Sequence, residues 1–144
     1  MNNKTQNTEP IIEVKDLMKS FGDNHVLINF NLVLNKGENL IIMGKSGSGK
    51  SVLIKCIIGL EKADGGTIMV MGKKINELDR TTLDELRTEV GFLFQGSALY
   101  DSMTVRENLE FPLRRHTKKF GVIKDTTPLV LQALENVGLA HTIN

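Results

Sequence analysis

The sequence predicts an α/β fold in which a small antiparallel β-sheet comes first and strands then alternate with helices. Residues 11–35 alternate between apolar and polar side chains, as half-buried antiparallel strands do. The runs 40–43 and 90–95 are instead almost continuously apolar, as in parallel strands that are covered on both faces. Helices are expected after both runs. This order of elements is typical of an α/β domain that carries a β appendage.

The composition is that of an ordinary globular protein. Of the 144 residues, 40% are hydrophobic and 24% are charged, which suits a single domain with a real core. The net charge of +1 gives no overall field that would attract nucleic acid or a membrane surface. Cys56 is the single cysteine, so no internal disulfide can form, and we expect this residue to be buried and inert. No apolar run approaches the roughly 18 residues of a membrane span, and the polar N-terminus lacks a signal-peptide pattern.

Turn residues divide the first half of the chain. Gly, Asp, Asn and Lys cluster at 22–24, 35–38 and 63–66, where each cluster favours a reversal of the backbone. Between these turns we expect, in order, strands at 11–21, 25–35 and 40–43, a helix at about 50–60 and a strand at 67–71.

Three helices of the second half have recognisable starts. A Thr followed three residues later by Glu is a capping box, in which each side chain bonds the backbone N–H of the other residue. The third start is an N-cap Thr followed by Pro, and its helix should end before a glycine. The three helices are marked by Thr82 with Glu85 (to about Glu89), by Thr104 with Glu107 (to about Leu113, with Pro112 ending or kinking it), and by Thr127 with Pro128 (before Gly138).

A phosphate-binding loop is the strongest motif of the sequence. Gly44, Gly49, Lys50 and Ser51 have the spacing G-x-x-x-x-G-K-[ST], after an apolar run and at the start of a helix. The glycines let successive backbone N–H groups turn inward toward an anion, and the helix adds its positive N-terminal end. The alternative is a solvated glycine-rich turn. The spacing would arise by chance in roughly one in 200 chains of this length, so the phosphate-binding interpretation is favoured.

The loop assigns roles to particular side chains. Lys50 would reach the β- and γ-phosphates of a nucleotide, and the Ser51 hydroxyl would bind Mg²⁺. The expected ligand is therefore ATP with Mg²⁺. The residues expected to surround its phosphates are Gly44, Lys45, Ser46, Gly47, Ser48, Gly49, Lys50 and Ser51.

Three segments, in order, resemble the ATP-binding domain of ABC transporters. The first is Lys19–Ser51, a β-hairpin followed by the phosphate-binding loop. The second is Leu60–Ile75, which resembles the segment after the loop helix, and the third is Val90–Leu113, which resembles the Q-loop and the entry to the helical subdomain. The chain is therefore identified as the N-terminal portion of an ABC-type ATPase, a P-loop NTPase fold whose parallel core sheet is incomplete within these residues.

The resemblance implies a division of the chain into four regions. They are a polar N-terminal arm at 1–10, a β-subdomain at 11–38 and 67–75, a P-loop core at 39–66 and 76–95, and the Q-loop with the start of the helical subdomain at 96–144.

The resemblance also implies further site residues. Phe21 matches the aromatic residue that stacks on adenine, a contact worth about 1–3 kcal/mol per base. Val26 would line the same pocket. Gln95 matches the glutamine that contacts Mg²⁺ and the attacking water, and so joins Lys50 as a catalytic residue. The alternatives are an ordinary core phenylalanine for Phe21 and a polar residue at a strand end for Gln95.

The loop after Gln95 carries apolar residues that suggest a partner. Leu99, Tyr100 and Met103 match the region of the family that packs against the transmembrane permease subunit, although partial burial within the chain would explain them too. Residues 96–117 are most similar to ATPases of Mla/Mce-type lipid transport systems, which implies transport of a phospholipid-type substrate. The family also implies a head-to-tail homodimer at the cytoplasmic face of the membrane, with no nucleic acid partner.

Motifs that the family needs for turnover are absent from these 144 residues. They contain no L-S-G-G-Q-type signature, no apolar strand ending in Asp-Glu and no later switch histidine. The chain alone is therefore expected not to hydrolyse ATP. Two alternatives remain open: a soluble ABC-type ATPase of the DNA repair or translation kind, and a fragment that binds nucleotide without catalysis.

Overall fold

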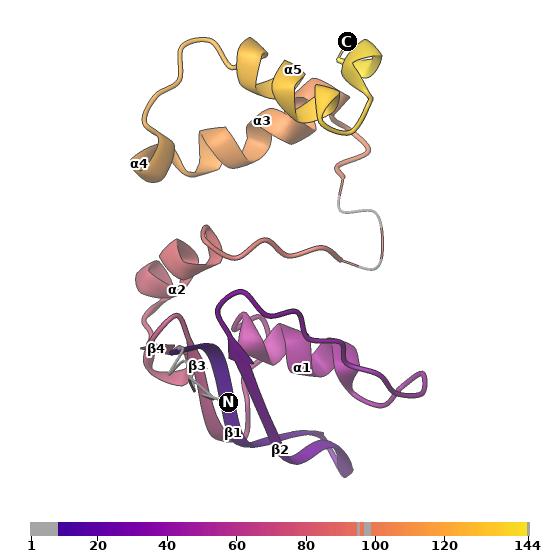
Figure 1. Cartoon of the computed structure of the whole chain (residues 1–144), viewed down its shortest axis with the longest axis vertical. Helices are drawn as coiled ribbons and strands as arrows, with labels where there is room; N and C mark the ends of the chain where they lie inside the picture. Colours follow the sequence, from indigo (N-terminus) through magenta and orange to yellow (C-terminus); the bar gives the residue numbers. More distant parts are fainter. Residues whose placement is uncertain (1–8, 95, 97–98, 144) are drawn as a thin grey trace, which may run out of the picture. The chain divides into compact units, whose positions relative to one another are not determined.

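The computed structural model describes residues 9–94, 96 and 99–143, and the chain divides into two compact units. The first unit comprises Met1–Val90 and the second Gly91–Asn144. Each unit is described by itself below (Figure 1).

The first unit is built on a four-stranded antiparallel sheet in the order β2-β1-β3-β4 (Figure 1). The first three strands agree with the expected strands at 11–21, 25–35 and 67–71 to within a residue or two, because alternating side chains mark a sheet with one buried face. Their bounds are β1 (Pro10–Phe21), β2 (Asn24–Asn35), β3 (Gly65–Val70) and β4 (Lys73–Lys74).

Strand β1 contains a bulge at Asp16. This residue has φ of 48°, and β1 holds one more residue there than either neighbour, since Val14 pairs with Leu32 and Leu17 with Phe30. The extra residue shifts the alternation by one, so Val14 and Leu17 are both buried although they lie three positions apart. Gly66 faces the bulge with φ of +84°, and a Cβ there would lie 2.5 Å from the carbonyl oxygens of residues 15 and 16. Only glycine fits at this position.

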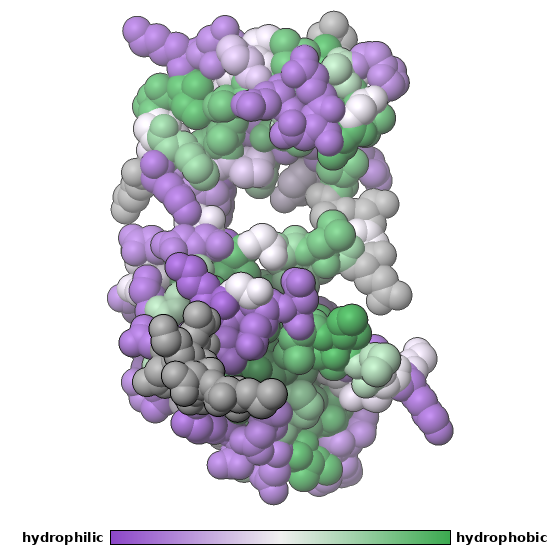
Figure 2. All heavy atoms as spheres, viewed as in Figure 1, coloured by the Kyte–Doolittle hydropathy of each residue, from purple (hydrophilic) through white to green (hydrophobic). Residues whose placement is uncertain are grey.

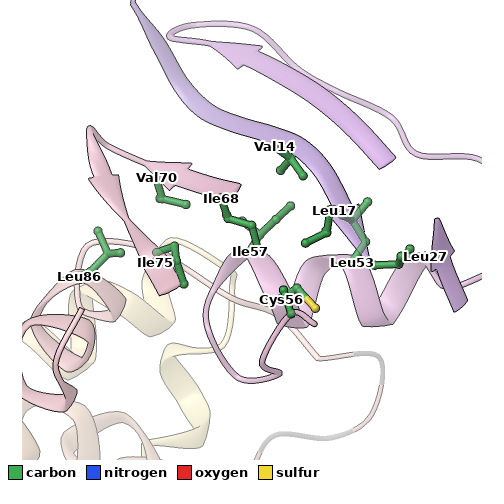
Figure 3. Close-up of a cluster of buried hydrophobic side chains, with 11 residues drawn as sticks. Val14, Leu17, Leu27, Leu53, Cys56, Ile57, Ile68, Val70, Ile75 and Leu86 are labelled. Carbon is green, nitrogen blue, oxygen red and sulfur yellow. The ribbon is translucent and has the colours of Figure 1, made fainter. Parts of the chain in front are cut away.

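Helix α1 (Lys50–Ile57) packs its buried face against the sheet, and its side chains complete the core (Figure 3). The helix ends three residues earlier than the expected 60, because Gly59, with φ of 67°, forms a left-handed C-terminal cap. The hydrogen bonds of this cap run from Leu60 N to Lys55 O and from Gly59 N to Cys56 O. The buried core residues are Val14, Leu17, Leu27, Leu53, Cys56, Ile57, Ala63, Ile68, Val70, Ile75 and Leu86.

Two short helices complete the first unit, and one of the predicted capping boxes is wrong. After η1 (Ile75–Glu77), helix α2 spans Arg80–Arg87 and buries Leu86. Its N-cap is Asp79, whose carboxylate accepts a 2.7 Å hydrogen bond from Thr82 N. Thr82 therefore lies inside the first turn and does not cap the helix. An Asp placed three residues ahead of Thr82 offers a charged acceptor, which is the stronger cap.

The apolar runs 40–43 and 90–94 do not form the expected strands. Neither run is assigned to a strand, and Ile41, Met43 and Leu93 are 81%, 88% and 91% exposed. A strand covered on both faces needs neighbouring strands to bond its backbone, and the four strands among the described residues all belong to the antiparallel sheet. The apolar pattern reports a tendency to be buried, but it does not supply the partner. Apolar side chains, these among them, are exposed in both units, and Figure 2 shows apolar surface on one face of each.

The second unit is helical, and its main helix confirms the second capping box. In α3 (Val105–Arg115), the Thr104 hydroxyl accepts from Glu107 N at 3.2 Å and the Glu107 carboxylate accepts from Thr104 N at 2.8 Å. Pro112 lies inside this helix, which ends three residues beyond it. Helices α4 (Thr117–Phe120) and α5 (Thr127–Glu135) and the short η2 (Ala140–Thr142) follow.

Helix α5 starts one residue before the position expected for it. Its N-cap is Thr126 and not Thr127, and the Thr126 hydroxyl donates to Glu110 instead of capping the backbone. The C-terminal glycine is confirmed, because Gly138 has φ of 74° and donates to Glu135 O at 3.0 Å. Among the described residues, no helix is both long enough and apolar enough to cross a bilayer.

Candidate functional site

The predicted phosphate-binding loop lies at the N-terminus of α1. Gly47 and Gly49 have φ of 78° and 88°, and Gly49 is the left-handed N-cap of the helix. No side chain caps the first turn of α1, and that turn contains no acidic residue. The N–H groups and the positive end of the helix therefore face the loop without an internal anion to neutralise them.

The motif glycines lie where the surroundings leave little room for a side chain. A Cβ on Gly44 would lie 2.6 Å from the Ser48 hydroxyl oxygen. A Cβ on Gly49 would lie 2.9 Å from a methyl group of Val26 and 3.1 Å from its carbonyl oxygen. The second position is the stricter one, because a backbone oxygen cannot rotate away. Side chains are thus excluded at both motif glycines, which leaves the backbone of the loop open to an anion.

Lys50 holds its ammonium group against the loop that it follows. Nζ donates to the carbonyl oxygens of Gly44 and Lys45, both at 2.8 Å. The positive charge thus lies within the curve of residues 44–50, where a phosphate bound by the loop would need it. Ser51 lies exposed in the first turn of α1, where its hydroxyl is available to Mg²⁺. The residues present fit a magnesium nucleotide.

A small cavity lies between the loop and β2. Its volume is about 150 Å³, and Ser48, Gly49 and Lys50 line it together with apolar side chains of β2 that include Val26 and Phe30. Ligand pockets usually hold about 300–1,000 Å³, so this cavity by itself is too small for a nucleotide. The candidate site is therefore the open surface of the loop, with this cavity beside it.

Phe21 and Val26 lie at the hairpin end of β1 and β2. Phe21 is the last residue of β1 and pairs with Asn24 of β2. Its exposed fraction is 47%, whereas Leu17, four residues earlier on the same strand, is fully buried. Val26 lies next to the loop at 44–49, because its methyl group and carbonyl oxygen border the position that a Cβ of Gly49 would take. The ammonium of Lys19 lies 4.9 Å from the centre of the Phe21 ring.

A cluster of charged residues surrounds Lys19. Its ammonium pairs with Glu61 at 3.0 Å and with Asp64 at 3.4 Å. The hydrogen bond with Glu61 raises the pKa of Lys19 above its usual 10.5, and the bond from Ser20 N lowers the pKa of Asp64 below its usual 3.8. Sequence reasoning missed Lys19, although a lysine at a core-facing strand position was a visible signal.

Cys56 is buried as expected, and burial raises the pKa of its thiol.

The predicted partner residues lie in the second unit, and Gln95 lies outside the described residues. Leu99 is 65% exposed and Tyr100 is 51% exposed, whereas Met103 is half-buried. The Tyr100 ring packs at 5.1 Å on that of Phe111 from α3.

Asn108 of α3 fixes the loop that carries these residues, and sequence reasoning missed it. Its side-chain oxygen accepts from Tyr100 N at 2.7 Å. Its amide nitrogen donates to the carbonyl oxygens of Tyr100, Met103 and Thr104. These bonds tie the backbone of Tyr100, Met103 and Thr104 to α3, and the side chains of Leu99 and Tyr100 remain exposed.

Comparison with known proteins gives consistent matches. The family profile described as "ABC transporter" matches residues 27–144. The chain is 43% identical over 129 residues to the probable ribonucleotide transport ATP-binding protein mkl of Mycobacterium leprae, covering 89% of this chain and 36% of that protein. It is 41% identical to the methionine import ATP-binding protein MetN of Clostridium tetani, covering 88% and 40%. The chain thus spans little more than a third of the length of these relatives.

A solved structure shows the same fold. A dimeric ATP-binding cassette, captured in a post-hydrolysis state with ADP and Pi, matches with a TM-score of 0.75 and 32% identity, over 88% of this chain and 56% of that one. The predicted fold class, a P-loop ATPase of the ABC type with an N-terminal antiparallel subdomain, is confirmed. From the loop at 44–51 and the match over residues 27–144, the chain belongs to the ABC transporter ATP-binding family.

Proposed function

We propose that this chain binds MgATP on the loop at 44–51 and serves as the ATP-binding part of an ABC transporter. The observation that carries the proposal is the position of Lys50. Its ammonium bonds the carbonyl oxygens of Gly44 and Lys45, and the helix that begins at Lys50 has no side-chain cap at its N-terminus. A triphosphate needs this combination of oriented N–H groups and a fixed positive charge. The Mg²⁺ ion would neutralise phosphate charge and would be held by Ser51, with Gln95 as the second candidate ligand.

The two ends of the nucleotide would contact different elements. The half-exposed ring of Phe21 suits stacking on adenine, and Val26 of β2 lies against Gly49 of the loop. The dimeric cassette with ADP and Pi supports the same ligand class for this family. Binding would thus extend from the hairpin end of β1 to the N-terminus of α1.

A titration tests this proposal. Replacing Lys50 with Ala should weaken binding of a fluorescent ATP analogue by at least about a hundredfold, because a charge-assisted bond to phosphate is lost from the centre of the loop. Lys55→Ala is the matched control, since Lys55 is an exposed lysine on the same helix. Equal affinities for the wild type and Lys50→Ala would reject the phosphate-binding assignment.

We also propose a membrane partner, a dimeric state and a location for the complete protein. The relatives' names place them in transport systems, which supports a transmembrane permease as partner and a location at the cytoplasmic face of the membrane. Leu99, Tyr100 and Met103 would contact that permease, and the complete protein would form a head-to-tail homodimer, as the solved dimeric cassette supports. The lipid-type cargo rests on residues 96–117 alone, because the two named relatives are described with ribonucleotide and methionine.

A further inference from the structure

Lys19 places a charge on the core-facing side of β1. It lies two residues after Leu17 and two before Phe21, so all three side chains leave the strand on one face. Leu17 is fully buried, and only 10% of the Lys19 side chain is exposed. Lysine is almost never buried to this degree unless its charge is paired.

Two carboxylates hold this ammonium from the segment between α1 and β3. Glu61 lies 3.0 Å from Nζ and Asp64 lies 3.4 Å from it. The second oxygen of Asp64 accepts a 2.6 Å bond from Ser20 N, so this residue grips the lysine side chain and the backbone next to it. The hydrogen bond with Glu61 raises the pKa of Lys19 despite the opposing effect of burial, so the ammonium form is retained.

The same ammonium lies over the ring of Phe21, 4.9 Å from its centre. This distance is within the range of cation–π attraction, which favours one orientation of the ring. The end of the hairpin is further fixed by a 2.8 Å hydrogen bond between Ser20 Oγ and His25 Nδ1. The ring is therefore held from one side while nearly half of its surface stays open.

We propose that Lys19 is a positioning residue for nucleotide binding: it holds the Phe21 ring in place as the platform on which the base stacks. This inference rests on the proposed function, because it assumes that a nucleotide occupies the loop at 44–51. Through Glu61 and Asp64, Lys19 also ties the platform to the segment that continues directly from α1, whose other end carries the phosphate loop. The base platform is thereby linked to the phosphate loop through α1, in addition to the contact of Val26 of β2 with Gly49.

Calorimetric titration of the chain with two probes, MgATP and magnesium tripolyphosphate, separates base binding from phosphate binding. Lys19→Met keeps a similar side-chain length without charge and should weaken MgATP binding about threefold to tenfold. Tripolyphosphate, which has no base, should bind within about twofold of its wild-type affinity. Lys19→Arg should restore most of the MgATP affinity, because guanidinium also stacks on aromatic rings. Lys15→Met is the control, as Lys15 lies on the same strand with its side chain 63% exposed.

Each outcome has a defined meaning. Unchanged MgATP affinity in Lys19→Met, or equal loss for both probes, overturns the positioning role. If Lys19→Met does not fold, the Glu61→Gln/Asp64→Asn double variant replaces it, and selective loss of MgATP binding again supports the proposal while wild-type affinity overturns it. In Lys50→Ala both probes should bind weakly. If neither probe binds the wild type, the proposed function fails and this inference fails with it.

Discussion

At the scale of single residues, Gly49 is subject to two independent constraints. Its φ of 88° lies in the left-handed region, which any residue with a Cβ adopts at a cost of about 1–2 kcal/mol. In addition, a Cβ would approach the Val26 carbonyl oxygen to 3.1 Å. Gly47 shares the first constraint but not the second, because nothing lies within 4 Å of its Cβ position. The pair therefore separates backbone strain from steric contact.

We expect Gly49→Ala to lower the free energy of unfolding by about 2–4 kcal/mol and Gly47→Ala by about 1–2 kcal/mol. The larger loss for Gly49→Ala reflects the displacement of Val26 and of the first residues of β2. Urea denaturation followed by circular dichroism measures both values. Equal losses in the two variants would mean that β2 moves aside freely, and that the close approach of Val26 to the loop does not constrain the site.

At the scale of elements, Glu110 joins α3 to α5. Its side chain is 7% exposed and accepts from the Thr126 hydroxyl at 2.6 Å. It also pairs with Arg114 one turn along α3 and with Arg106 at 3.7 Å. The bond from Thr126, followed by the bond with Arg114, lowers the pKa of Glu110 below its usual 4.5. The ionised form is therefore the one that holds the two helices together.

This shift predicts acid sensitivity of the second unit. A carboxyl group whose pKa is lowered on folding stabilises the folded form fully above its usual 4.5, and this stabilisation is lost as the pH falls through the lowered value. Glu107 contributes in the same direction, because its bond from Thr104 N lowers its pKa. The protection of α5 amides against hydrogen exchange, corrected for the intrinsic slowing of exchange in acid, should therefore fall below about pH 4.5, and less steeply in Glu110→Gln than in the wild type. Identical pH profiles in the two proteins would show that ionised Glu110 does not stabilise the contact between α3 and α5.

The sequence predicted elements whose signals are local, and it failed where an element needs a distant partner. The capping box at Thr104 and the glycine cap at Gly138 were found because all their hydrogen bonds lie within a few residues. The run 40–43 was assigned to a strand because it is apolar, but a strand depends on neighbours that no local pattern specifies. Lys19 was missed for a related reason, since its partners lie more than forty positions away along the chain.

At the scale of the whole molecule, the exposed side chains of Leu99 and Tyr100 allow a test of the proposed permease contact. Leu99→Asp or Tyr100→Asp in the complete protein should reduce co-purification with the membrane subunit, since a charge at an apolar contact is costly to bury, while nucleotide binding is retained. Val122→Asp is the control, because Val122 is 86% exposed and lies outside this loop. Undiminished complexes with both variants would favour the soluble ATPase alternative.

These 144 residues are expected to bind MgATP without steady-state turnover. Phosphoryl transfer depends on positioning and charge stabilisation from both sides of the γ-phosphate, and the loop at 44–51 supplies one side. The 144 residues contain neither the signature motif nor the Asp-Glu strand end of this family. A phosphate-release assay on the purified chain should give a rate that Lys50→Ala leaves unchanged. Release that depends on Lys50 would show that the chain completes the site by another route.

The bulge in β1 has a consequence for how the length of this strand can vary. Asp16 is surplus in both of its ladders, so a chain without it would keep residues 14 and 17 on the same face by ordinary alternation. Gly66 would at the same time be released from the two carbonyl oxygens that now exclude a side chain. A one-residue deletion at 16 and a substitution at 66 are thus coupled: in a homologue with the shorter strand only the φ of +84° would still favour glycine at 66, whereas one that keeps the insertion must keep the glycine for steric reasons as well.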